Sequence, residues 1–226
     1  MTHLILKAIR IVSRQQDNIF QQHECLNQLN VRLAPKVPLP HTRRYRGSPD
    51  FLLELHHLIK QHKPEFIVEA SSGVSTLVAA YTLQQLGHGR IVSLENDARY
   101  ARASRALLEE HGLLPYASVI HAPLTSFEIE GQKWLWYEIS KASLPEQIDM
   151  VIIDGPPDRV QRNARYPALP LLIKRLSSRG LLILDDASRP TESRIIRMWQ
   201  KRYKDLKVTS VSTEKGMAII SRGESQ

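Results

Sequence analysis

The sequence predicts an α/β fold: a doubly wound, mostly parallel sheet of seven strands, closed by an antiparallel C-terminal hairpin and preceded by an N-terminal helical extension. Five apolar runs alternate with helical segments, and they cover residues 66–69, 90–95, 117–121, 149–154 and 180–185. Apolar strands that are each followed by a helix are typical of a parallel sheet covered on both faces. Two more runs, at residues 206–211 and 217–221, are joined only by a short turn, which forces them to pair antiparallel.

Residues 1–33 are expected to form a basic amphipathic helix. Charged residues recur at steps of three and four along one side, among them Lys7, Arg10 and Arg14, and apolar residues fall on the other side. Such a helix docks on its own domain, pairs with a second subunit or lies on a membrane surface, and the first two uses are the commoner ones. We therefore expect a homo-oligomer formed through this helix, with membrane contact as the minor alternative.

A proline-rich, basic linker at residues 34–47 separates this extension from the main domain at residues 48–226. Three prolines in six residues favour extended backbone in the linker. The main domain opens with a helix that begins at Pro49, with Ser48 as its N-cap. Its later helices are expected at residues 75–87, 97–111, 167–178 and 190–203, and glycines stand at positions 87 and 112, where helices commonly end.

The first strand of the main domain runs into a turn of small residues. Glu69 is followed by Ser71-Ser72-Gly73 and then by the start of a helix, so backbone comes close to a ligand while free N–H groups point at it. Glu95 closes the next strand, 22 residues after Gly73, at the spacing of a ribose-binding carboxylate. The glycines of a dinucleotide fingerprint are missing. The alternative is an ordinary strand-turn-helix with Ser75 as N-cap.

Composition points to a globular protein of a reducing compartment. The 226 residues suffice for one sizeable core, and contents of 42% hydrophobic and 24% charged residues are ordinary. Cys25 is the only cysteine, so neither an internal disulfide nor a cysteine metal cluster can form. Lys7 and Arg10 interrupt the apolar N-terminus before a signal peptide could form, and no window is apolar enough for a membrane span. We expect a cytoplasmic protein.

Several motifs together carry a family resemblance. They are Val68-Glu69-Ala70-Ser71-Ser72-Gly73-Val74-Ser75-Thr76, Ile153-Asp154-Gly155-Pro156-Pro157, Leu184-Asp185-Asp186 and Arg165-Tyr166-Pro167-Ala168-Leu169. With these motifs and the closing hairpin, the chain resembles the S-adenosylmethionine-dependent class I methyltransferases, which have a Rossmann-like fold. Within them it is most similar to the small-molecule and sugar O-methyltransferases of the macrocin type. The likeness spans residues 48 to about 221, most of the chain outside the extension.

The resemblance implies a set of residues that bind S-adenosylmethionine. Glu69 and the turn at residues 71–73 would bind its methionine and ribose part, Glu95 its ribose hydroxyls, and Ala122 would lie near the adenine. The whole implied set is Glu69, Ser71, Ser72, Gly73, Ser75, Thr76, Glu95, Asn96, Ala122 and Asp154. Ser71 stands where the family usually has glycine, so a side chain intrudes at the closest approach to the cofactor.

Asp154, Asp185 and Asp186 each end or follow an apolar strand. Since the carboxyl ends of parallel strands form the ligand crevice, we expect these side chains to converge there. Three oxygen ligands suit a hard divalent ion such as Mg²⁺, which would lower the pKa of an acceptor hydroxyl and hold its oxygen in line with the methyl group. The resemblance supports this metal site. Alternatively, Asp154 contacts the cofactor while Asp185 and Asp186 cap the next helix.

The general base is left open among the catalytic candidates Asp154, Asp158 and His121. The macrocin-type pattern has a further Asp two residues after the first metal ligand, where this chain has Pro156. Asp158 is the nearest carboxylate, and histidine side chains titrate near neutral pH, which suits His121 to this role.

Two other groups of residues have both a functional and a structural explanation. Arg159, Arg162 and Arg165 follow at three-residue steps and either face an anionic substrate or form a solvated face. Trp134, Trp136 and Tyr137 alternate as in a hairpin, and either line the acceptor site or pack a core, which is commoner.

The leading hypothesis is methyl transfer from S-adenosylmethionine to a hydroxyl of a small molecule or glycan, assisted by a divalent ion. The net charge of +8 fits an anionic acceptor or simply solubility. An RNA methyltransferase is an alternative that rests on this charge and on Arg43-Arg44-Tyr45-Arg46, but neither an N-P-P-Y motif nor an appended RNA-binding module is found. We therefore do not expect a nucleic-acid partner. The third hypothesis is a non-catalytic, cofactor-binding scaffold.

Overall fold

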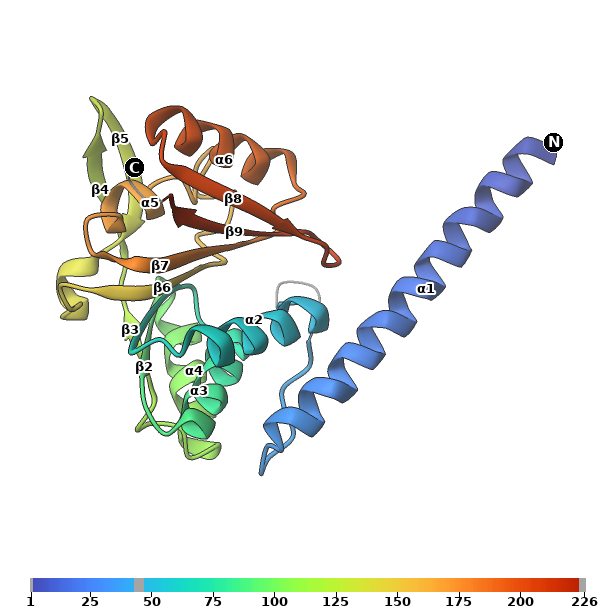
Figure 1. The fold of residues 1–226 in the computed structure, drawn as a ribbon, viewed down its shortest axis with the longest axis horizontal. Coiled ribbons are helices and arrows are strands. Elements are labelled where there is room, and N and C mark those ends of the chain that lie inside the picture. The colour runs from blue at the N-terminus through green and yellow to red at the C-terminus, as the bar shows by residue number, and fades with distance from the viewer. Residues whose placement is uncertain (1, 43–46, 224–226) are drawn as a thin grey trace.

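The computed structural model describes the backbone of residues 2–42 and 47–223, and the basic run Arg43-Arg44-Tyr45-Arg46 lies outside the described residues. Its helical elements (Figure 1) are α1 (Thr2–Leu33), α2 (Pro49–His62), α3 (Val74–Leu86), α4 (Ala98–Glu110), η1 (Ile139–Ala142), α5 (Ala168–Leu172) and α6 (Pro190–Arg202). Its strands are β1 (Phe66–Ala70), β2 (Arg90–Glu95), β3 (Ala117–His121), β4 (Leu124–Ile129), β5 (Gln132–Tyr137), β6 (Ile148–Ile153), β7 (Leu176–Asp185), β8 (Leu206–Val211) and β9 (Met217–Arg222).

The central sheet has seven strands in the order β3-β2-β1-β6-β7-β9-β8. Neighbouring strands from β3 to β7 are parallel, whereas β9 pairs antiparallel with both β7 and β8. The predicted fold class is therefore confirmed, with its N-terminal helix and C-terminal hairpin. Because the five parallel strands run the same way, their carboxyl ends share one edge of the sheet.

Alternate residues of the strands pack against two different layers. On one face, Ile67 and Ile91 lie in a core with residues of α2 and α3. On the other face, Val68 and Val92 lie in a second core that includes Trp199 of α6. The sheet is thus covered on both sides, which explains why its strands are continuously apolar.

The crossover from β3 to β6 runs through a β-hairpin and η1. Strands β4 and β5 pair antiparallel, and Glu130 and Gly131 form their turn with φ of 54° and 72°. Trp134 and Trp136 are buried in the second core, and the ring centroids of Trp134 and Tyr166 are 4.7 Å apart. The predicted hairpin is confirmed, and its tryptophans pack a core.

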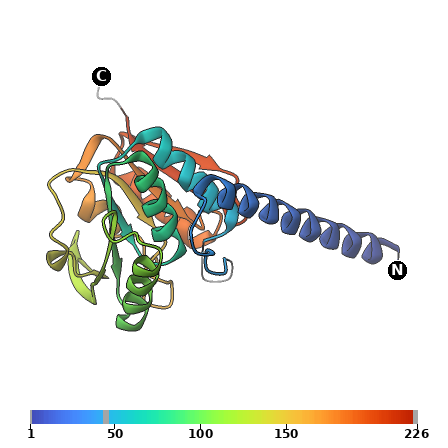
Figure 2. The same ribbon diagram turned by 90° about the horizontal axis from the view of Figure 1, so that it is seen from below.

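Helix α1 docks by its C-terminal part and projects into solvent by its N-terminal part (Figures 1 and 2). Leu29 and Leu33 are buried in the core that includes α2 and α3. Gln22 donates from Nε2 to Oδ2 of Asp50 at 2.8 Å and accepts from the backbone N–H of Asp50 at 3.2 Å. Docking on its own domain is thereby confirmed as one use of this helix. Among the described residues, no helix is both long and apolar enough to cross a membrane.

Two further contacts tie α1 and α2 to the turn between β8 and β9. The backbone N–H of Glu214 donates to Oδ2 of Asp50 at 2.6 Å, and Asn18 donates from Nδ2 to Oε1 of Glu214 at 2.9 Å. Asp50 therefore joins the first helix, the second helix and the closing hairpin.

The helix predicted at residues 167–178 is wrong in its second half. Helix α5 ends at Leu172, and β7 has begun by Leu176. Arg175 explains the difference, because its backbone oxygen accepts from Ile148 at 2.7 Å and its Nη1 donates to the carbonyls of Leu144 and Pro145. These tertiary bonds extend the sheet at the expense of the helix.

Candidate active site

The turn between β1 and α3 lies at the carboxyl edge of the sheet. Helix α3 takes Gly73 as its N-cap residue, and Thr76 accepts from the backbone N–H of Gly73 at 3.0 Å. The prediction of Ser75 as N-cap is therefore wrong, because its hydroxyl turns inward to Glu69. Ser71 has φ of 122° and Gly73 has φ of 148°, a region that favours glycine. Ser71 thus adopts the backbone of the glycine it replaces.

Glu69 supports this turn from beneath. Its side chain is fully buried and accepts hydrogen bonds from three hydroxyls: Ser75, Thr76 at 2.6 Å and Ser93 at 2.5 Å. Burial raises the pKa of Glu69 to about 7, and the three hydroxyl bonds oppose that rise. Both carboxyl oxygens are used within the protein, so Glu69 shapes the turn between β1 and α3.

Ser72 and Glu95 connect the turn to the end of β2. The Ser72 hydroxyl donates to Oε2 of Glu95 at 2.9 Å, and the backbone N–H of Asp97 donates to Oε1 at 3.0 Å. Ala122 is buried. Its N–H donates to the backbone oxygen of Glu95 at 2.8 Å, which places it beside these residues. Asn96 is half-buried next to Glu95. The structure therefore brings the predicted ribose and adenine residues together along β1, β2 and β3.

The three strand-end aspartates converge as expected. Their ligand oxygens all lie within 4.8 Å of one another. Asp185 and Asp186 are buried, whereas the side chain of Asp154 is 16% exposed and is the one that reaches open space. Neither Asp185 nor Asp186 is the N-cap of α6, which is Arg189.

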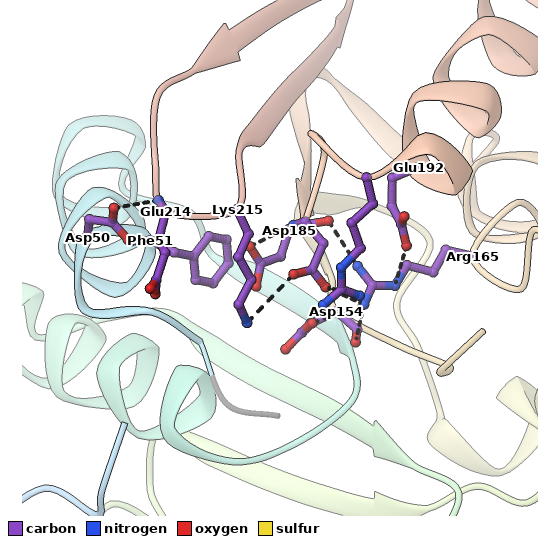
Figure 3. A network of polar contacts seen from close by, with 10 residues as sticks. Asp50, Phe51, Asp154, Arg165, Asp185, Glu192, Glu214 and Lys215 are labelled. Atoms are coloured by element: carbon purple, nitrogen blue, oxygen red, sulfur yellow. Dashed lines mark hydrogen bonds and ion pairs between the residues drawn. The ribbon is translucent and has the colours of Figure 1, made fainter. Parts of the chain in front are cut away.

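Arg165 lies among these carboxylates, and its side chain is only 4% exposed. Nη2 donates to Oδ1 of Asp154 at 3.2 Å and to Oδ2 of Asp186 at 2.9 Å, and Nη1 donates to the backbone oxygen of Asp185 at 2.9 Å. Figure 3 shows the guanidinium between Asp154 and Glu192, and its Nε lies 3.6 Å from Oε1 of Glu192. The sequence places Arg165 in a series of arginines, but it did not indicate this buried position.

Sequence reasoning missed three members of the cluster: Arg189, Glu192 and Lys215. Nη1 of Arg189 lies 2.8 Å from Oδ2 of Asp186, and Nζ of Lys215 lies 3.7 Å from Oδ1 of the same carboxylate. Glu192 is completely buried. The one signal for Glu192 is its place in the first turn of α6, three residues after the N-cap, where acidic residues are favourable.

Burial dominates the acid–base behaviour of the cluster. It raises the pKa of Asp154, although Arg165 pulls that pKa down. It also raises the pKa of Asp185 to about 8, with further contributions from the charges of Asp154 and Asp186. A raised carboxyl pKa brings proton transfer toward neutral pH, which suits an acid or a base.

Of the other predicted catalytic residues, His121 lies away from Asp154, whereas Asp158 lies on the loop that follows it. His121 ends β3, and β2 and β1 separate β3 from β6, so the strands are about 14 Å apart at roughly 4.8 Å per interval. Asp158 is exposed in the loop after β6, as are Arg159 and Arg162. The three arginines do not form one face, since Arg165 alone turns inward.

Tyr137 closes the site from the hairpin side. Its side chain is buried, and its hydroxyl would lie 2.3 Å from a Cβ added at Gly155. Gly155 is therefore required by the close approach of Tyr137 to the backbone that follows Asp154.

A family model described as a methyltransferase domain matches residues 70–187. A search of curated proteins gives no significant match. Among solved structures, the SAH-bound methyltransferase PaMTH1 of Podospora anserina aligns over 96% of both chains, with 15% identity and a TM-score of 0.63. An O-methyltransferase from Bacillus cereus in complex with SAH aligns over 88% of this chain and 90% of its own, with 17% identity and a TM-score of 0.58. TomG of Streptomyces achromogenes, an O-methyltransferase in complex with SAM, aligns over 89% of both chains, with 16% identity and a TM-score of 0.57.

Proposed function

Since the chain belongs to the methyltransferase domain family, whose model matches more than half of it, we propose that it transfers a methyl group from S-adenosylmethionine to a hydroxyl of a small molecule or glycan. The observation that carries this proposal is the bond from Ser72 to Glu95, which joins the glycine turn to a carboxylate at the end of β2. This pairing presents backbone and an acceptor for ribose hydroxyls at one edge of the sheet. The solved O-methyltransferases named above support the choice of cofactor and of oxygen as acceptor.

The reaction needs one base. The acceptor oxygen forms a bond to the methyl carbon while the carbon–sulfur bond breaks, and sulfur keeps the electron pair. The hydroxyl proton passes to a carboxylate. Asp154 is the carboxylate we propose, because it follows β6 beside the cofactor turn, is partly exposed and has a raised pKa. Its backbone N–H donates to the oxygen of Ala70 at 3.2 Å, which places it next to that turn.

The acceptor is proposed to be anionic or neutral and to enter over the loop after β6. The exposed side chains of Arg159 and Arg162 support an anionic acceptor, because they add positive potential at that entrance.

The three aspartates supply the oxygen donors that a hard divalent ion prefers. Their arrangement does not fit an added ion, because the guanidinium of Arg165 already bonds both Asp154 and Asp186. No step of the proposed reaction therefore passes through a metal.

Titration calorimetry tests cofactor use. The wild-type protein is expected to bind S-adenosylmethionine and S-adenosylhomocysteine, and Glu95→Gln is expected to weaken both by about tenfold or more, since a charge-assisted bond to ribose is lost. Glu109→Gln is the matched control, because Glu109 is exposed on α4. Absence of heat from either cofactor with the wild-type protein would contradict the proposal.

A turnover assay then separates an enzyme from a non-catalytic binding protein. Methyl transfer from labelled S-adenosylmethionine is measured with a panel of catechols, phenols and sugar hydroxyls. We expect turnover that Asp154→Asn reduces far more than it reduces cofactor affinity. Cofactor binding with no turnover on the whole panel would favour the scaffold hypothesis.

A further inference from the structure

We infer that the guanidinium of Arg165 is the built-in cation of the strand-end carboxylates, in the position that a divalent ion would otherwise take, an inference that rests on the proposed function. Arg165 acts through Asp154 and is in that sense a positioning residue. Methyl transfer by this chain accordingly needs no metal.

The first support is geometric. Nη2 of Arg165 lies 3.2 Å from Oδ1 of Asp154 and 2.9 Å from Oδ2 of Asp186, so it bridges two of the three carboxylates that would ligate an ion. A magnesium ion needs oxygens at about 2.0–2.1 Å in a near-octahedral arrangement. An amino group between the same oxygens occupies that volume.

The second support is the use of the remaining donors and acceptors. Nη2 also donates to the backbone oxygen of Asp154 at 3.0 Å, and Nη1 donates to the backbone oxygen of Asp185 at 2.9 Å. Oδ1 of Asp185 accepts from the backbone N–H of Asp186 at 2.7 Å. The planar fork of the guanidinium therefore fits the ends of β6 and β7 as a bidentate group, a geometry that lysine cannot reproduce.

The third support is charge. The cluster contains four carboxyl groups, those of Asp154, Asp185, Asp186 and Glu192. Three cations face them, Arg165, Arg189 and Lys215. With all groups ionised the cluster carries one net negative charge, and a divalent ion would turn this into a net positive charge in a largely buried place. Since unbalanced buried charge is costly, the cluster is already close to neutral without a metal.

The consequence for catalysis concerns Asp154. Two bonds from Nη2, one to the backbone oxygen and one to Oδ1, hold the carboxylate of Asp154 at the end of β6. The guanidinium stays charged at every working pH, so the arginine side of this contact does not titrate. The positive charge of Arg165 stabilises the ionised form of Asp154, which is the form that accepts a proton.

Manganese titration followed by electron paramagnetic resonance tests the inference without relying on activity. We expect the wild-type protein and Arg105→Met to leave added Mn²⁺ free, and Arg165→Met to bind about one ion per chain. Arg105 is the control, because it is an exposed arginine of α4 whose Nε donates to the backbone oxygen of Val119, outside the cluster. Binding of Mn²⁺ by the wild-type protein at micromolar concentration would overturn the inference.

Kinetics give a second measurement. Wild-type turnover is expected to persist in excess EDTA, whereas Arg165→Met lowers kcat by about 100-fold with KM for S-adenosylmethionine unchanged, because Asp154 is misplaced. Arg165→Lys should restore little of kcat, because an ammonium group cannot reproduce the planar fork. Reversible loss of wild-type activity in EDTA would overturn the inference even if Arg165→Met failed to fold.

A wild-type protein that binds neither cofactor would instead contradict the proposed function, while the Mn²⁺ result would still decide the identity of the cation.

Discussion

Glu69 is a fully buried carboxyl whose pKa is raised from 4.5 to about 7, first by burial. Because the folded state keeps its proton up to a higher pH than the unfolded state does, Glu69 favours folding below pH 4.5. That contribution is lost as the pH rises through about 7. The loss amounts to about 3 kcal/mol, because the folded and unfolded pKa values of 4.5 and about 7 differ by about 2.5 units and each unit corresponds to about 1.4 kcal/mol. Acidic conditions therefore strengthen the packing beneath the cofactor turn.

Glu69→Gln should remove this dependence of the free energy of unfolding on pH. Urea unfolding at pH 5, 6, 7 and 8 is the measurement, and the difference between variant and wild type isolates Glu69 from Asp154 and Asp185, whose pKa values are also raised. We expect the wild type to lose stability relative to the variant as pH rises, while Glu109→Gln follows the wild type. Parallel curves for wild type and Glu69→Gln would contradict the assignment.

Ser71 has a positive φ of 122° without being a glycine. Such backbone strain costs on the order of 1–3 kcal/mol of folding free energy. A glycine would relieve this strain, while its greater freedom in the unfolded chain would cost roughly 0.4–1 kcal/mol. Ser71→Gly should therefore raise the melting temperature by about 2–4 °C, as followed by calorimetry. Ser210→Gly in the exposed strand β8 is the control with the opposite sign, since glycine weakens a regular strand. A lower melting temperature for Ser71→Gly would show that the turn is not strained.

At the scale of elements, α1 carries a second apolar face. Val12, Phe20 and Val31 are 51%, 66% and 80% exposed. At about 100° per residue, Phe20 and Val31 lie roughly half a turn, and Val12 roughly a quarter of a turn, from the docked face of Gln22 and Leu29. A helix that already docks on its own domain has no internal use for these side chains. The pairing of two copies through this face stays a prediction.

Light scattering tests that pairing. Phe20→Asp is expected to lower the mass of a wild-type dimer to that of a monomer at micromolar concentration, because a charge would be buried at the contact. Gln21→Asp, at an exposed position about 100° around the helix from Phe20, should leave the mass unchanged. A wild-type protein that is already monomeric would contradict self-association. Cofactor affinity should not change in either variant.

The elements of the sheet were predictable because each is specified locally. Apolar runs mark the strands, Gly87 and Gly112 mark helix ends with φ of 76° and 68°, and the short turn through Gly216 dictates an antiparallel pair. The stretch after α5 was not predictable, since Arg175 decides it through carbonyls about thirty residues earlier in the chain. Helical spacing cannot reveal a bond that depends on the finished fold.

At the scale of the whole molecule, the site was predictable only where the topology determines it. The carboxyl ends of parallel strands meet, so Glu95 and the three aspartates could be placed together from the order of strands. Arg165 lies in an irregular stretch after β6, and neither its inward turn nor its contact with Glu192 follows from spacing. The order of strands therefore predicted the position of the aspartates but not that of Arg165, which balances their charge.

The contacts of Asp50 also set an order of events during synthesis. Asn18 and Gln22 leave the ribosome before Glu214, which bonds both Asn18 and Asp50 and follows Asn18 by 196 residues. At about 5–20 residues per second, roughly 10–40 seconds separate them. Over that interval the nascent first helix lacks its contacts with the turn between β8 and β9. Its apolar side chains are then open to chaperones or to a neighbouring nascent chain. The last two strands to be translated finish the docking of the first helix.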